Sequence, residues 1–288
     1  MMNATVCCNK VSGELSAISS KSIAHRLLIG SAFCDKPTQI HCDTVNRDIL
    51  ATARCLSAMG ADIEYKNQVF NVTPIKERSS DILDCDESGT TLRMLLPIAC
   101  AIGGTWRFIM KGRLPERPLS PLKEELEAHG ITFEYPSYGE LVVNGKLECG
   151  SYSIRADVSS QFISGLLFAL CLLDGKSTLT ITGKVESAMY IQMTLDTLIS
   201  LGADITKANN VFTVNASPLM SLEAPYVEGD WSNAAFPLCA GALNGSVTLY
   251  NVNPASVQGD VRILELLKKF GADVSVSDDN RSVTVSHK

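Results

Sequence analysis

Gly60-Ala61-Asp62-Ile63 returns twice along this chain, as Gly202-Ala203-Asp204-Ile205 and as Gly271-Ala272-Asp273-Val274, and this repeat decides the fold. A looser copy stands at Gly130-Ile131-Thr132-Phe133, so the four glycines are 70, 72 and 69 residues apart. Each glycine follows an apolar run with helical spacing, and glycine readily adopts the left-handed conformation that ends a helix. The pattern predicts one supersecondary unit that occurs four times.

Short alternating segments follow these glycines. Val-Phe-Asn-Val at 69–72 comes after Asn67, and Val-Phe-Thr-Val at 211–214 comes after Asn209-Asn210. Two such segments joined by a polar turn are typical of a β-hairpin. The predicted unit is therefore helix, strand, turn, strand, which places the protein in the α/β class as an α+β repeat.

The composition fits a large soluble chain of one or two domains. Its 288 residues are 45% hydrophobic, which is enough for a sizeable core. No apolar run reaches the roughly 18 residues of a membrane span, and residues 1–10 lack a secretory pattern, so we expect a cytoplasmic protein without a membrane partner. Ten cysteines without a Cys-x-x-Cys pair indicate free thiols and no metal framework. The net charge of −6 argues against a nucleic-acid partner, because nucleic-acid binding usually needs a basic surface.

Local basic residues stand where the repeat predicts helix starts. Ser19-Ser20-Lys21-Ser22 precedes an apolar run at 23–33, and Arg26 lies one turn inside it. The free N–H groups and positive dipole end of a helix attract phosphate or carboxylate, and Lys21 and Arg26 add full charges. The alternative is a serine cap with two solvated cations, and this stretch alone does not decide between them.

A second candidate cluster is Glu87-Ser88-Gly89-Thr90-Thr91-Leu92-Arg93, again a loop that leads into a helix. Gly89 would let the backbone approach a small ligand, and Thr90 and Thr91 could cap the helix. Arg93 would offer a forked donor for phosphate or carboxylate. The alternative is a capped helix with a surface arginine.

A third cluster, Lys111-Gly112-Arg113-Leu114-Pro115-Glu116-Arg117-Pro118, precedes a helix predicted over Leu119–His129. The two prolines stiffen the loop and limit where Arg117 can point. A solvated basic loop is the alternative here.

Two further helix starts carry hydroxyl groups. Asp157-Val158-Ser159-Ser160-Gln161-Phe162 leads into a helix through Leu172, and Glu186-Ser187-Ala188-Met189-Tyr190 precedes another, with Ser187 as its cap. Each of these alone is an ordinary cap. Because all five clusters fall at loop-to-helix junctions of one repeat, we expect them to converge on one polyanionic ligand.

Seven motifs stand in the order of one enzyme family. They are Ser20-Lys21-Ser22 with Arg26, Ser88 to Arg93, Glu116-Arg117-Pro118, Ser159-Ser160-Gln161-Phe162, Ser187 with Tyr190, Glu228-Gly229-Asp230, and Gln258-Gly259-Asp260-Val261-Arg262. The chain resembles the 5-enolpyruvylshikimate-3-phosphate synthases, also called 3-phosphoshikimate 1-carboxyvinyltransferases, from end to end. The UDP-N-acetylglucosamine enolpyruvyl transferases are the alternative, but they have Lys-Asn where this chain has Lys21-Ser22, and a loop cysteine that is lacking near Arg113–Arg117.

The resemblance implies enolpyruvyl transfer from phosphoenolpyruvate to the 5-hydroxyl of shikimate 3-phosphate, on the route to chorismate and aromatic amino acids, with no metal or organic cofactor. It assigns shikimate 3-phosphate to Lys21, Ser22, Arg26, Ser159, Ser160, Gln161, Ser187 and Tyr190. It assigns phosphoenolpyruvate to Lys21, Gly89, Thr90, Arg93, Arg117 and Gln161. The glycine at position 89 further implies sensitivity to glyphosate.

The family fold is an inside-out α/β barrel of two domains with three units each. We expect residues 19–225 to form one complete three-unit domain, and residues 1–18 plus 226–288 to form a second domain with one unit. On this expectation the chain is truncated at its C-terminus after four of six units, and it lacks the catalytic acid and base. The lone chain would then be inactive, or a non-catalytic fragment or remnant that binds shikimate 3-phosphate. Self-association, or a complementing C-terminal piece, would be expected.

Overall fold

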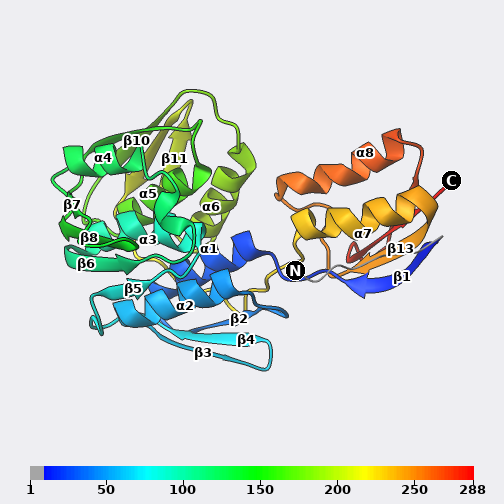
Figure 1. Cartoon of the computed structure of the whole chain (residues 1–288), viewed down its shortest axis with the longest axis horizontal. Helices are drawn as coiled ribbons and strands as arrows, with labels where there is room; N and C mark the ends of the chain where they lie inside the picture. The colour runs from blue at the N-terminus through cyan, green and yellow to red at the C-terminus, as the bar shows by residue number, and fades with distance from the viewer. Residues whose placement is uncertain (1–9) are drawn as a thin grey trace. The chain divides into compact units, whose positions relative to one another are not determined.

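Helices and short strands alternate along residues 10–288, the part of the chain that this computed structural model describes (Figure 1). The strands are β1 (Val11–Ser16), β2 (Thr38–His41), β3 (Asp62–Lys66), β4 (Val69–Thr73), β5 (Ile82–Asp84), β6 (Gly104–Ile109), β7 (Thr132–Glu134), β8 (Glu140–Gly145), β9 (Ser151–Arg155), β10 (Ser177–Thr182), β11 (Asp204–Ala208), β12 (Val211–Asn215), β13 (Gly245–Tyr250), β14 (Asp273–Val276) and β15 (Ser282–Ser286). The helices are α1 (Lys21–Ala32), α2 (Arg47–Met59), α3 (Gly89–Ile102), α4 (Leu122–Ala128), α5 (Ser160–Cys171), α6 (Ala188–Ser200), α7 (Trp231–Asn244) and α8 (Ile263–Lys269), with 3-10 turns η1 (Leu114–Glu116) and η2 (Gly259–Arg262).

The predicted helix, strand, turn, strand unit is confirmed in all four places. It forms as α2-β3-β4, α4-β7-β8, α6-β11-β12 and α8-β14-β15. All four repeat glycines have positive φ values, between 85° and 118°. Gly60 ends α2 by donating its N–H to the carbonyls of Leu56 and Ser57, and a Cβ there would lie 2.0 Å from the carbonyl oxygen of Glu77. Backbone conformation and close packing therefore both require glycine at this position.

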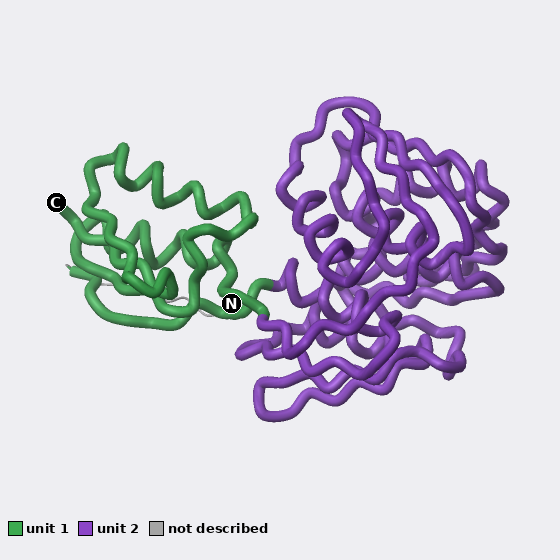
Figure 2. Tube along the Cα trace, turned by 180° about the vertical axis from the view of Figure 1, so that it is seen from behind, with its two compact units in different colours: residues 1–20, 227–288 green, residues 21–226 purple. Residues whose placement is uncertain are grey.

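The chain divides into two units, which Figure 2 draws in different colours. Unit 2 comprises residues 21–226, and unit 1 comprises residues 227–288 with the N-terminal segment up to residue 20. Residues 1–9 of the expected second domain lie outside the described residues.

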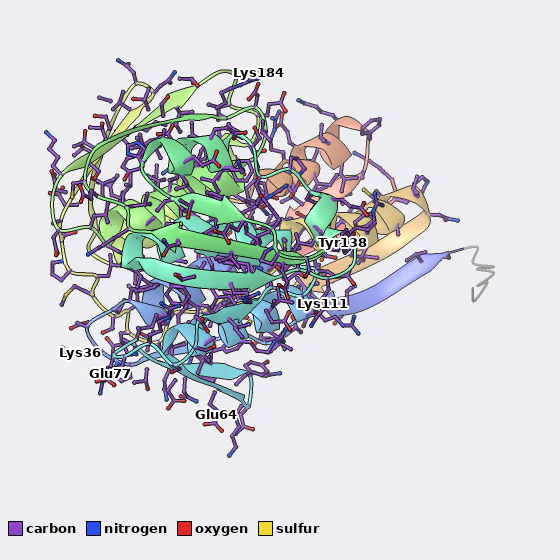
Figure 3. The ribbon with its side chains drawn as sticks, turned by 60° about the vertical axis from the view of Figure 1, so that its left-hand side comes forward. Lys36, Glu64, Glu77, Lys111, Tyr138 and Lys184 are labelled. Atoms are coloured by element: carbon purple, nitrogen blue, oxygen red, sulfur yellow. The ribbon has the colours of Figure 1, made fainter. Side chains whose placement is uncertain are left out.

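Helices α1, α3 and α5 are largely buried inside unit 2 and its sheets lie outside them, as the inside-out arrangement predicts (Figure 1). Helices α3 and α5 pack so closely that a Cβ on Gly165 would lie 2.7 Å from the carbonyl oxygen of Arg93. The sheets turn Phe70, Phe108 and Phe212 inward, while Glu64 of β3 points outward (Figure 3). The strands of residues 10–288 form four separate sheets and do not close into one barrel.

The same strand order recurs from sheet to sheet. In β5-β6-β8-β7, β9-β10-β12-β11 and β1-β13-β15-β14, two parallel strands are followed by two antiparallel ones. The remaining sheet, β2-β4-β3, receives one parallel bridge from the end of unit 2, where Tyr226 pairs with His41, and Leu219 forms a second parallel bridge with Cys34, which precedes β2. The Tyr226 hydroxyl also donates to the Asp43 carboxylate at 2.6 Å. The last residues of unit 2 thus complete its first sheet.

Unit 1 is one sheet covered on one face by two helices. Strands β1, β13, β15 and β14 pack against α7 and α8 around Trp231, Leu238, Leu249, Val283 and Val285. Across residues 10–288, no helix is long and apolar enough to cross a membrane.

Two sequence predictions about helix starts are wrong. Helix α4 begins at Leu122 and not at Leu119, because Pro121 stands at the position before the helix and disfavours helical geometry in the residue that precedes it. The cap of α3 is Ser88, whose hydroxyl accepts the Thr91 N–H at 3.2 Å, and not Thr90 or Thr91. Both threonines already lie in the first turn, where their side chains cannot reach the free N–H groups.

Candidate functional site

Four helix N-termini of unit 2 open onto one cleft of about 350 Å³. The helices are α1, α3, α5 and α6, and each contributes residues from one of the clusters singled out in the sequence. The residues that line the cleft are Lys21, Ser22, Arg26, Thr90, Arg93, Met94, Val158, Ser159, Ser160, Gln161, Ser187 and Tyr190. The expected convergence of helix starts is therefore present for four of the five clusters.

Lys21 is the first residue of α1 and is half-exposed at the cleft. Its ammonium group lies 3.0 Å from the carboxylate of Asp48, in the first turn of α2. The sequence analysis missed Asp48, because nothing local to it indicates that α2 starts beside α1. This ion pair fixes the direction of the Lys21 side chain, although a partly exposed pair contributes little stability.

Arg26 is 2% exposed and donates four hydrogen bonds within the protein. Its Nε donates to Thr194 at 2.8 Å, Nη1 to the Ser22 carbonyl at 2.7 Å, and Nη2 to Ser164 at 3.2 Å and to the Tyr190 carbonyl at 2.9 Å. Burial lowers the pKa of Arg26 to about 10, so the guanidinium stays charged at neutral pH. Arg26 therefore ties α1, α5 and α6 together, and its role toward a ligand carboxylate stays a prediction.

Arg93 and Gln161 join the α3 and α5 sides of the cleft. Arg93 Nη1 donates to Gln161 Oε1 at 3.2 Å, and Gln161 Nε2 donates to Thr90 Oγ1 at 2.8 Å. Arg93 Nη2 donates to the Pro118 carbonyl at 3.1 Å, while its Nε is buried without a hydrogen-bond partner. The structure thus brings together three residues that the sequence analysis had assigned to phosphoenolpyruvate.

Arg117 lies against the start of α3 but outside the cleft lining. A Cβ on Gly89 would be 2.8 Å from Arg117 Nη1, so the guanidinium rests on the glycine. The pKa of Arg93 is lowered, first by burial and then by the positive charge of Arg117. Two neighbouring cations at a helix N-terminus favour a bound anion, because it would relieve their repulsion.

The third cluster does not enter the cleft as a whole. Lys111 pairs with Asp84 at 2.7 Å, and Arg113 pairs with Glu116 at 3.6 Å. Of the three cations in this loop, only Arg117 is placed toward a predicted site residue.

Serine hydroxyls line the α5 and α6 side. Ser159 caps α5 by accepting the Gln161 N–H at 3.2 Å, and Ser160 follows as the first helical residue. Ser187 stands at the cap position of α6, as predicted, but makes no capping bond, because its φ of −120° and ψ of 48° depart from the extended cap conformation. Its hydroxyl is therefore not used by the helix.

The cleft combines three cationic side chains with four positive helix ends, and no carboxylate or histidine is among its lining residues. This arrangement can hold an anion or two close anions in an otherwise acidic chain. Among the residues described, no three His, Cys, Asp or Glu side chains gather to hold a metal ion.

Comparison with known proteins identifies the family of this chain. The family model described as EPSP synthase (3-phosphoshikimate 1-carboxyvinyltransferase) matches residues 7–288. A curated 3-phosphoshikimate 1-carboxyvinyltransferase of Brachyspira hyodysenteriae is 39% identical over 99% of this chain and 68% of its own length. One from Clostridium botulinum is 36% identical over 94% of this chain and 64% of its own length.

Solved structures show the same fold. EPSP synthase from Acinetobacter baumannii has a TM-score of 0.79 and 21% identity, and the match covers 96% of this chain and 65% of that one. The enolpyruvyl transferase NikO from Streptomyces tendae has a TM-score of 0.70 and 17% identity, over 97% and 66%. The chain thus spans about two thirds of the length of these proteins. On the family model and the curated relatives, the chain belongs to the EPSP synthase (3-phosphoshikimate 1-carboxyvinyltransferase) family.

Proposed function

We propose that this chain serves the transfer of the enolpyruvyl group from phosphoenolpyruvate to the 5-hydroxyl of shikimate 3-phosphate, with release of phosphate. The observation that carries the proposal is the single cleft onto which four helix N-termini and Lys21, Arg26 and Arg93 converge. Both substrates are phosphorylated carboxylates, and charge-assisted hydrogen bonds of about 1.5–3 kcal/mol each can hold them without a metal. We take units 2 and 1 to be the two domains of the family fold.

The hydroxyl-rich side of the cleft would hold shikimate 3-phosphate. Its phosphate would contact Ser159, Ser160 and Ser187, and the remaining contacts would come from Lys21, Ser22, Arg26, Gln161 and Tyr190. Phosphoenolpyruvate would lie at the start of α3, with Lys21, Gly89, Thr90, Arg93, Arg117 and Gln161. We expect glyphosate to compete with phosphoenolpyruvate at this second position.

Acid–base catalysis requires groups that the cleft does not offer. No carboxylate or histidine lines it in the described part of the chain, and such groups usually carry proton transfer. Glu228 of unit 1 instead accepts from Asn253 and Gln258, at 2.9 and 2.8 Å, and Asp230 caps α7. We therefore expect substrate binding from this chain alone and turnover only when further groups are supplied. A non-catalytic protein that binds shikimate 3-phosphate is the second candidate.

Calorimetric titration tests the substrate assignment. Saturable heat with shikimate 3-phosphate, and at least about tenfold weaker binding of unphosphorylated shikimate, are expected because the serines contact the phosphate. Ser160→Ala should weaken binding of the phosphate ester and leave that of shikimate unchanged. A folded chain that binds neither compound would overturn the proposal. Turnover after addition of the C-terminal third of a relative would separate the transferase from the non-catalytic binder.

We further propose a protein partner for unit 1, either a second copy or a complementing piece. Phe236 and Leu243 of α7 are each 77% exposed, and Phe270 after α8 is 87% exposed. Exposed apolar side chains in one unit are typical of an interface. Sedimentation velocity should show association that Phe236→Asp abolishes, while Tyr138→Asp, at an equally exposed position of unit 2, should not change it. A monomer at all concentrations, with and without the piece, would contradict this.

The cytoplasm stays our proposed location. The cysteines from Cys34 onward are free thiols, most of them buried, which suits a reducing compartment.

A further inference from the structure

A chain of hydrogen bonds that the ligand assignment does not use runs through the interior of unit 2. His25 Nδ1 lies 2.7 Å from Thr52 Oγ1, Thr52 Oγ1 lies 2.7 Å from Thr91 Oγ1, and Thr91 donates to Ser88 Oγ at 2.7 Å. The four residues are all at most 1% exposed. They form one buried polar network, here called the His25 chain, that crosses three helices.

The two ends of the His25 chain meet the two halves of the cleft. His25 lies in the first turns of α1, between Ser22 and Arg26, which line the cleft. Ser88 caps α3, and Thr91 follows Thr90 of the cleft lining. Thr52 belongs to α2, which packs against both α1 and α3. The network thus connects the start of α3 with the start of α1.

The histidine costs stability at this place. Its Nε2 is buried without a hydrogen-bond partner, which leaves the desolvation of that nitrogen uncompensated. Burial lowers the pKa of His25 to about 3, with Lys21 and Arg26 opposing a charge and Asp48 favouring one, so the ring is neutral at physiological pH. An apolar side chain would fill the position without an unpaired nitrogen. A polar group that costs stability is expected where it serves a site.

We propose that His25 is a positioning residue, which through Thr52, Thr91 and Ser88 aligns the α3 half of the cleft with the α1 half. Arg93 and Gly89, assigned to phosphoenolpyruvate, stand on the element that the network fixes. The identity of the ligand in this inference rests on the proposed function, whereas the alignment of the two helix starts does not depend on it. His25 is not among the residues that line the cleft, and it is not a catalytic residue.

Three variants test the proposal. His25→Asn keeps a hydrogen-bonding atom near the position of Nδ1 and removes the unpaired Nε2. His25→Leu and Thr52→Val break the network at its end and in its middle without entering the cleft. We expect His25→Leu and Thr52→Val to bind phosphoenolpyruvate about tenfold more weakly, and His25→Asn to bind within about twofold of the parent. The double variant His25→Leu with Thr52→Val should be no weaker than either single one.

Amide hydrogen exchange gives a readout without ligand. The amides of Thr91 and Leu92, in the first turn of α3, should exchange faster in His25→Leu and Thr52→Val and at the parent rate in His25→Asn. Unchanged exchange and binding in His25→Leu would overturn the proposal. The proposal would also fail if His25→Asn bound phosphoenolpyruvate as weakly as His25→Leu, because His25 would then act only through packing. If the parent chain binds no phosphoenolpyruvate, the proposed function fails, and the exchange rates alone decide the role of His25.

Discussion

Acid should destabilise unit 2 through one buried imidazole. His25 has a pKa of about 3 in the folded chain and an ordinary value of 6.5 when exposed to water, because burial disfavours its charged form. Between these values the unfolded chain binds more protons than the folded chain, so stability falls as the pH drops below 6.5. From about pH 7 to about pH 5, this difference amounts to ~2 kcal/mol for His25 alone.

Urea unfolding at the two pH values measures this loss. Trp106 lies in unit 2 and Trp231 in unit 1, so a Trp231→Phe background makes the fluorescence report unit 2. In that background we expect the free energy of unfolding to fall by ~2 kcal/mol more in the parent than in His25→Asn between pH 7 and pH 5. His41→Asn, at an exposed position of β2, is the matched control and should behave as the parent. Equal losses in the parent and in His25→Asn would refute a buried neutral imidazole.

Three further predictions concern the cleft. Gly89→Ala should weaken the binding of phosphoenolpyruvate about tenfold, because the new Cβ would lie 2.8 Å from Arg117 Nη1 and displace it. The binding of shikimate 3-phosphate, measured in the same calorimeter, should stay unchanged. Asp48→Asn should remove the ion pair that Asp48 forms with Lys21 and strengthen phosphoenolpyruvate binding about threefold at low salt, an effect that vanishes at high salt in parallel titrations. Ser160→Ala should weaken the binding of shikimate 3-phosphate about fivefold without changing the midpoint of urea unfolding. A shifted midpoint would indicate a structural role for Ser160 instead.

The local parts of this fold could be predicted from the sequence. The hairpins after Gly60 and Gly202 were predicted, and so was a helix start at residues 19–22, because a turn or a helix start depends on a few adjacent residues. Thr194 and Ser164 could not be predicted as partners of Arg26, since 168 and 138 residues separate them from it. Such contacts depend on how whole helices pack, and a serine or threonine inside an apolar helix gives no local sign of its partner.

In the cleft too, features set by local sequence could be predicted, and features set by helix packing could not. Its hydroxyl and cationic residues were found because each belongs to a helix start with a recognisable pattern. The orientation of Lys21 by Asp48 was missed, because it depends on where α2 starts relative to α1. The His25 chain was missed for the same reason: each of its hydroxyls reads as an ordinary helical residue until the three helices are packed.

The return of the chain to its first sheet has a consequence for folding during synthesis. Tyr226 hydrogen-bonds to Asp43 over a separation of 183 residues, and Ser221 to Asp35 over 186. A ribosome makes residues 38–41 long before residues 219–226, so one edge of β2 stays open while most of unit 2 emerges. Open strand edges invite pairing with other chains, and contacts of such high sequence separation form slowly. We therefore expect the nascent chain to be more prone to aggregate before Tyr226 leaves the ribosome than after it, and a chaperone that binds extended segments would help before that point.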